Sequence, residues 1–216
     1  LQLGSAFGNT GYFGIPVSLA LLPDHALIYS IGFDLGATLV IWSLGPILLT
    51  DPSKVLSSNR YWKNFIKGIF SSPAVKGLIG ALIIHSSPWD EQITDLLWIP
   101  SRVVIVLALV IVGMRLSWLR KANLSRIKNQ ITSIKNALIM KLVGLPVIML
   151  IISSAIRLPS VMREALVLQA AAPTAISILL ISQAASRDEK EATSLVVFST
   201  ITALISIPAW LLILRL

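Results

Sequence analysis

Long apolar runs separated by short polar stretches fill nearly the whole chain. A helix needs about 20 largely apolar residues to cross the hydrocarbon core of a bilayer. Helices of that kind are predicted at residues 3–22, 27–49, 69–87, 96–115, 137–156, 164–183 and 192–214. The pattern thus predicts an all-α polytopic membrane protein with seven spans.

Two of these spans carry interruptions that predict broken helices. The first lies at Gly8-Asn9-Thr10-Gly11-Tyr12-Phe13-Gly14-Ile15-Pro16 and the second at Gln169-Ala170-Ala171-Ala172-Pro173-Thr174. A proline inside a helix removes one backbone donor, and closely spaced glycines permit unwinding and a close approach of backbone. Such backbone is tolerated in lipid only where it faces protein or a water-filled cavity, so both interruptions are candidate functional sites. A second interpretation stays open, because Gly4 and Gly8 also fit a face of small residues that packs helices together.

The two interruptions belong to span pairs that resemble each other. Pro16 is followed after 30 residues by Pro46 in the next span, and Pro173 is followed after 35 residues by Pro208. The seven-span pattern gives these two pairs opposite orientations in the membrane. Similar span pairs of opposite orientation are typical of inverted-repeat transporters, in which the substrate lies at the repeat interface.

Composition and charge placement agree with a membrane protein. Of the 216 residues, 55% are apolar and 13% are charged, whereas soluble domains carry about 25% charged residues. Twelve Lys and Arg residues fall in loops on one side of the predicted membrane, against two on the other side. The net charge of +8 therefore indicates membrane topology and not nucleic-acid binding. We expect a multi-pass protein of the cell (plasma or inner) membrane, with its basic loops in the cytoplasm and its C-terminus outside. Single cysteines introduced at Ser58 and Gln92 should accordingly be labelled from opposite sides.

Two of the basic loops carry further structure. Apolar residues recur at every third or fourth position across 124–138, which predicts an amphipathic helix at the cytoplasmic interface. Tyr61, Trp62 and Phe65 stand beside basic residues and predict an interfacial anchor.

Charged residues within the spans are costly in lipid and are therefore further candidates. Asp34 is too short to reach the interface, so we expect it to face the protein interior, either as a proton-binding group or as a packing carboxylate. The long side chains of Lys76, Arg102 and Lys141 lie one to two turns from a span end, and we expect them to extend to the interface. None of these four residues falls at a predicted break.

Metal, cofactor and enzyme signatures are absent from the sequence. The chain holds no cysteine, and its two histidines cannot by themselves make a metal site. The motifs of zinc proteases, serine hydrolases and P-loop ATPases are missing. Neither an enzymatic activity nor a cofactor or metal is expected.

The first interruption also carries a resemblance to a known family. Asn9-Thr10-Gly11-Tyr12-Phe13-Gly14-Ile15-Pro16 resembles the fourth-helix motif of the auxin efflux carrier (PIN-like) permeases. Further stretches resemble the family's sixth, ninth and tenth helices, at Pro73-x-x-x-Gly77-x-x-Gly80, Ala172-Pro173-Thr174-Ala175 and residues 199–210. The short loop at 50–68 is similar to that of prokaryotic-type members, and the similarity covers essentially the whole chain.

This resemblance implies ten helices in two inverted five-helix repeats, in which the broken fourth and ninth helices cross each other. Residues 1–49 would then form the last two helices of the first repeat, with the broken helix at 3–22. Residues 50–68 would be a cytoplasmic linker and residues 69–216 the complete second repeat, with its broken helix at 164–183. The family's first three helices have no counterpart here, so we expect the native protein to be longer.

The resemblance further implies a permease that moves a small organic anion, auxin-like or a dicarboxylate, by alternating access. The rival interpretation is a seven-helix sensor or scaffold that transports nothing. The expected partners are the anion and membrane lipids; a homodimer is left open, and nucleic acid is not expected. Half-helices that begin at the two breaks should bind the anion through free N–H groups. The predicted substrate-binding residues are Asn9, Thr10, Gly11, Gly14, Pro16, Gln169, Pro173 and Thr174, with Asp34 as the candidate group for proton coupling.

Overall fold

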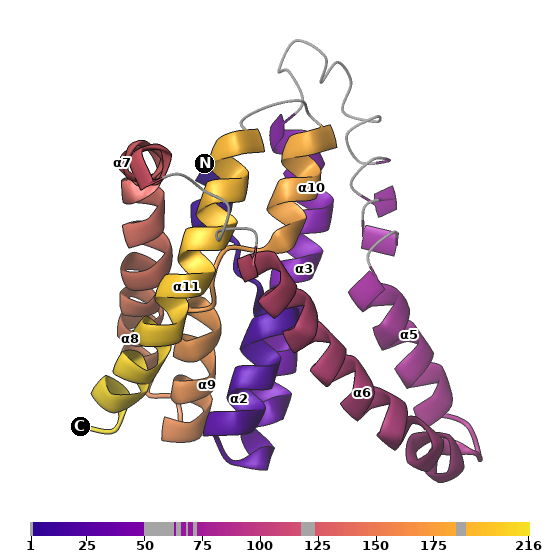
Figure 1. Cartoon of the computed structure of the whole chain (residues 1–216). Helices are drawn as coiled ribbons and strands as arrows, with labels where there is room; N and C mark the ends of the chain where they lie inside the picture. The colour runs from indigo at the N-terminus through magenta and orange to yellow at the C-terminus, as the bar shows by residue number, and fades with distance from the viewer. Residues whose placement is uncertain are drawn as a thin grey trace. The chain divides into compact units, whose positions relative to one another are not determined.

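The computed structural model describes residues 2–49, 73–117, 124–184 and 189–216, together with residues 63, 66, 67, 69 and 70. These residues are helical almost throughout (Figure 1). Three of the described helical stretches are long and apolar enough to cross a membrane, at Asp24–Ile41, Ile131–Ala155 and Lys190–Leu214. The prediction of an all-α membrane protein is therefore confirmed.

The chain divides into two compact units, Leu1–Asp34 with Leu109–Leu216, and Leu35–Ala108. The second unit contains most of α3 (Leu27–Leu49), α5 (Pro73–His85) and most of α6 (Asp90–Ser117). Many apolar side chains of α5 and α6 are exposed, which suits helices whose outer surface is covered by lipid. Arg102 is exposed as well, with its guanidinium carbon 5.5 Å from the centre of the Trp98 ring.

The first unit holds the remaining helices and both predicted interruptions. Its first part comprises α1 (Gln2–Ala6), the π turn η1 (Thr10–Gly14), α2 (Ile15–Leu21) and the short η2 (Asp24–Ala26). Its second part comprises α7 (Leu124–Ile139), the π turn η5 (Met140–Gly144), α8 (Leu145–Ala155), α9 (Ser160–Ala170), α10 (Ile176–Ala184) and α11 (Glu189–Leu214). Helix α11 packs against α7, α9 and α10, and α9 packs against α2, α8 and η1.

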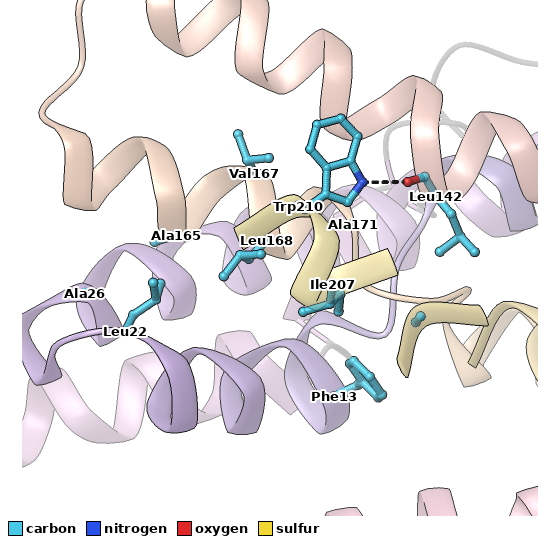
Figure 2. Packing of buried hydrophobic residues seen from close by; sticks show 11 residues of the cluster. Phe13, Leu22, Ala26, Leu142, Ala165, Val167, Leu168, Ala171, Ile207 and Trp210 are labelled. Atoms are coloured by element: carbon cyan, nitrogen blue, oxygen red, sulfur yellow. Dashed lines mark hydrogen bonds between the residues drawn. The ribbon is translucent and has the colours of Figure 1, made fainter. Parts of the chain in front are cut away.

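The core of this unit lies where η1, η5, α9 and α11 meet (Figure 2). Phe13, Leu142, Leu168, Ile207 and Trp210 are all buried there. The Trp210 indole N–H donates a hydrogen bond of 2.9 Å to the carbonyl oxygen of Leu142. That oxygen is the one whose α-helical donor is lost because Pro146 has no N–H. The core thus satisfies a backbone group that the proline would leave unpaired in lipid.

The helix predicted over 124–138 is observed as α7. Ile134 is completely buried while its neighbour Lys135 is exposed, as an amphipathic helix requires. The aromatic anchor at Tyr61, Trp62 and Phe65 and nearly all of the 50–68 linker lie outside the described residues.

Candidate functional site

The two interruptions form unwound stretches that lie side by side. Residues 7–9 separate α1 from η1, and residues 171–175 separate α9 from α10. Gly8 and Thr174 form an isolated antiparallel bridge. The Asn9 N–H donates to the Pro173 oxygen at 2.6 Å, and the Ala175 N–H donates to the Phe7 oxygen at 3.0 Å. Backbone groups that have no helical partner in one stretch therefore form hydrogen bonds with the other stretch. Such pairing is needed inside a membrane, where no water is available to bond them. We call this pairing the crossing.

Side chains and glycines hold the crossing tightly. The Thr174 hydroxyl donates to the Gly4 oxygen at 2.9 Å, and the Thr174 N–H donates to the Ser199 hydroxyl oxygen on α11 at 2.9 Å. A Cβ atom at Gly4 would lie 2.7 Å from a Leu195 methyl carbon, so the glycine allows α1 to lie close to this α11 side chain. The interpretation of Gly4 as a helix-packing residue is therefore supported alongside the break itself.

The first break does not lie at Pro16. Pro16 is buried near the start of α2. The preceding turn, η1, is π-helical, so its hydrogen bonds join residues five positions apart. Asn9 is the last residue of the unwound stretch, and its φ and ψ of −78° and 62° lie outside the helical region. The Asn9 oxygen accepts hydrogen bonds from the N–H groups of Phe13 and Gly14, at 3.1 and 3.0 Å. Helical structure therefore resumes directly after Asn9, about a turn and a half earlier than the proline suggests.

Asp34 lies at the first break, although it comes from α3. The Thr10 hydroxyl donates to Asp34 Oδ1 at 2.6 Å, and a Cβ atom at Gly11 would lie 3.1 Å from the same oxygen. A carboxylate near the first residues of a helix is favoured by the helix dipole. The Asn9 side chain is nearly buried beside it; it does not cap η1 and makes no hydrogen bond with any residue in the described ranges.

A second polar cluster lies one turn further into the helices. Gln169 is completely buried, and its Nε2 donates to the Ser18 hydroxyl at 3.4 Å. The Ser30 hydroxyl donates to that of Ser18 at 2.8 Å. A Cβ atom at Gly14 would overlap the Gln169 carboxamide, whose Oε1 atom has no hydrogen-bond partner in the described part of the chain.

Lys141 does not extend to the membrane interface as predicted. Its side chain is only 1% exposed, and its Nζ donates to the Ala170 oxygen at the end of α9, at 2.8 Å. A Cβ atom at Gly8 would lie 3.0 Å from the same nitrogen. The prediction that no charged residue falls at a break is wrong as well, because Lys141 lies against Gly8 and Ala170, and Asp34 lies against Thr10 and Gly11. The prediction for Lys141 used only its distance from the end of the span. That distance does not show whether the side chain faces lipid or the protein core.

Comparison with known families is decisive for the class of protein. A family profile described as "Membrane transport protein" matches residues 1–211. The chain belongs to this family. The match includes both sides of the crossing and confirms the resemblance to the auxin efflux carrier (PIN-like) permeases. Comparison with curated proteins and with solved structures gives no match.

The membrane transport protein brings most of the predicted binding residues together, in two groups. Asn9, Pro173 and Thr174 take part in the crossing itself, with Thr10, Gly11 and Asp34 next to it. Gly14 and Gln169 contact each other. The Thr174 hydroxyl proton is already donated to Gly4, and Pro16 is enclosed in α2, so both residues shape the site rather than offer a free donor.

Three polar contributors are missing from the sequence prediction: Ser18, Ser30 and Ser199. Nothing in the sequence separates these serines from others in apolar spans, because a single hydroxyl satisfies itself easily within a helix. For Lys141, the sequence does contain a signal. Gly144-Leu145-Pro146 repeats the glycine–apolar–proline pattern of Gly14-Ile15-Pro16. The pattern indicates that the helix carrying Lys141 resembles the broken helix at 3–22.

Proposed function

We propose that this membrane transport protein carries a small organic anion, an auxin-like monocarboxylate or a dicarboxylate, across a cell membrane by alternating access. The observation that supports the proposal is the crossing, in which residues 7–9 and 171–175 pair through backbone hydrogen bonds within a bundle of apolar helices. Transporters built from broken helices place their substrate where the half-helices meet. We place the anion at this point, with the basic loops in the cytoplasm.

The chemistry of the crossing favours an anion. Two helical segments begin there, at Thr10 and at Ile176. The first N–H groups of a helix have no partner within the helix and carry a partial positive charge. The Asn9 amide adds a side-chain donor beside them that the described residues leave unused. A carboxylate is the ligand that such donors accept best.

The way the two stretches are joined suits a carrier that changes shape. They meet at a single bridge, Gly8 with Thr174, and not along a ladder of many residues. Short junctions of this kind absorb the backbone changes of a hinge motion while the packed helices move as rigid bodies. In this proposal the helices on either side of the crossing rock about it, so that the anion faces one side of the membrane at a time.

Asp34 provides a route to proton coupling. Its carboxylate lies against Thr10 and Gly11, at the N-terminal end of η1, where we place the anion. A negative Asp34 competes with the anion for the same partial positive charge, whereas a protonated Asp34 does not. Protonation and anion binding then favour each other, which is the thermodynamic condition for moving both together.

Uptake into proteoliposomes tests the proposal. Labelled malonate and labelled indole-3-acetate represent the two substrate classes, and we expect saturable uptake of at least one of them that an inward proton gradient increases. Asp34→Asn should retain uptake but lose its response to the gradient. Asp95→Asn, an exposed carboxylate on α6, should behave as the wild type. Uptake that never saturates with either compound would support a sensor or scaffold instead.

A further inference from the structure

Lys141 is a charged group whose burial requires an explanation. It lies in η5, between α7 and α8, and is almost completely buried. Burying an ammonium group away from water is expensive unless a counter-charge and hydrogen bonds accompany it. A charged residue inside a membrane protein is therefore a functional candidate by default.

The surroundings compensate the charge of Lys141 only in part. Its Nζ donates to the Ala170 oxygen at 2.8 Å, and the C-terminal end of α9 contributes a partial negative charge of about one half. An ammonium group has three donors. No carboxylate forms an ion pair with Lys141 in the described ranges, and Asp34 is hydrogen-bonded to Thr10. Two donors therefore remain for a further partner, and no full negative charge in the described ranges offsets the ammonium group.

The ammonium group of Lys141 lies beside both unwound stretches. Ala170 is the last residue before the second unwound stretch, and Gly8 lies in the first. A Cβ atom at Gly8 would lie 3.0 Å from Nζ and 3.2 Å from the Ala172 oxygen. Glycine at this position therefore avoids a steric conflict with the Lys141 ammonium group. The free donors of Lys141 therefore lie where the two stretches meet.

We infer that Lys141 binds a carboxylate group of the transported anion at the crossing. The inference rests on the proposed function and names the positive side chain that the site uses. A lysine suits this role because its long stem is flexible and its ammonium acts as a point charge. The group can keep its hydrogen bond to Ala170 while it turns its other donors toward the anion. The anion in turn supplies the missing negative charge.

Two neutral variants test the inference. Lys141→Met keeps an unbranched side chain of similar length, and Lys141→Gln keeps a donor that can reach backbone oxygens. Binding is measured in detergent with whichever of malonate and indole-3-acetate the wild type takes up, and with its neutral counterpart, malonamide or indole-3-acetamide. We expect both variants to bind the carboxylate about 10- to 100-fold more weakly, because a hydrogen bond to a charged group is lost. The preference for the carboxylate over the amide should fall by a similar factor.

The matched control is Lys135→Met, which removes the same charge from an exposed position on α7. It should bind the carboxylate within about twofold of the wild type. Wild-type affinity in Lys141→Met and Lys141→Gln, or equal weakening for carboxylate and amide, would reduce Lys141 to a structural contact. Either result leaves the proposed function intact if the wild type still shows saturable uptake, so the two failures are distinguishable.

A measurement on the wild type decides the matter if neither variant folds. The protein is labelled with ¹⁵N at the lysine side chains and given malonate or indole-3-acetate carrying ¹³C in its carboxyl group. Solid-state NMR should then show a short-range dipolar contact between a lysine Nζ and the carboxyl carbon. The same contact should be present in Lys135→Met, which lacks an exposed lysine but keeps Lys141. Lys141 is buried, whereas the other lysine side chains that the structure describes are exposed. Bound carboxylate without any lysine contact would overturn the inference.

Discussion

The two π turns of the first unit, η1 and η5, invite comparison because each ends in the same glycine–apolar–proline sequence. η1 leads into Gly14-Ile15-Pro16, and η5 leads into Gly144-Leu145-Pro146. After the turn, the backbone is helical in both, with φ and ψ of −63° and −50° at Ile15 and −65° and −44° at Leu145. Before the turn, they differ. Asn9 has φ and ψ of −78° and 62°, outside the helical region, whereas Ile139 has −62° and −47° and continues α7.

This difference separates the effect of the proline from the cause of the break. Pro16 and Pro146 both lie just after a widened turn, which is how a helix accommodates a residue without an N–H group. Neither proline breaks its helix. The break occurs at Gly8 and Asn9, where a second unwound stretch offers hydrogen bonds through Pro173 and Thr174. Unwinding in this membrane protein therefore follows the availability of a partner for the backbone.

The largest difference between the two turns is expected from glycine-to-alanine substitutions. In Gly14→Ala, the new methyl group would overlap the carboxamide of Gln169, which is completely buried and has little room to move. Overpacking of this kind costs about 1–3 kcal/mol or more. In Gly144→Ala, the new methyl group would meet the Met140 sulfur at 2.7 Å, but a flexible methionine side chain can move aside. Thermal unfolding in detergent should thus show a clear loss of stability for Gly14→Ala and little change for Gly144→Ala.

Equal unfolding temperatures for these two variants would contradict the account of η1, because Gln169 would then not fill the space beside Gly14. The matched pair also controls for helix propensity, since both substitutions replace a glycine by alanine within a π turn. A difference between them therefore reports the packing around each turn.

Local sequence chemistry predicts most elements of the fold. The apolar runs predict the helices, the glycine- and proline-rich interruptions predict both unwound stretches, and the periodic pattern at 124–138 predicts α7. Helix α6 differs, because it begins at Asp90, ahead of the predicted span at 96–115. The exact position of the first break was not predictable, because Pro16 is the stronger local signal. What decides the position is the partner stretch at 171–175, which is far away in the sequence.

The candidate site was predictable only as far as residue types allow. Asp34 is predictable because a short charged side chain in an apolar span cannot reach the interface, and Asn9 because it lies in the interruption at Gly8–Pro16. The place of Lys141 is not predictable, because a side chain of its length can reach the interface from its position in the span; only the packing directs it to the Ala170 oxygen. Thr174 and Gln169 were found as polar residues, but their use in holding the crossing and the second cluster depends on contacts with Gly4 and Ser18.

A more local effect is expected at Asn9, the residue at which the two turns differ. It tests most directly that the crossing binds the anion. Asn9→Ala keeps the backbone hydrogen bond to Pro173 but removes the side-chain amide, so folding should be unchanged. The equilibrium affinity of the full-length protein for malonate or indole-3-acetate should fall about 10- to 100-fold, since a hydrogen bond to a charged ligand contributes about 1.5–3 kcal/mol. Asn136→Ala, an exposed asparagine on α7, is the matched control and should bind as the wild type does. Wild-type affinity in a folded Asn9→Ala variant would contradict the claim that the crossing is the binding site.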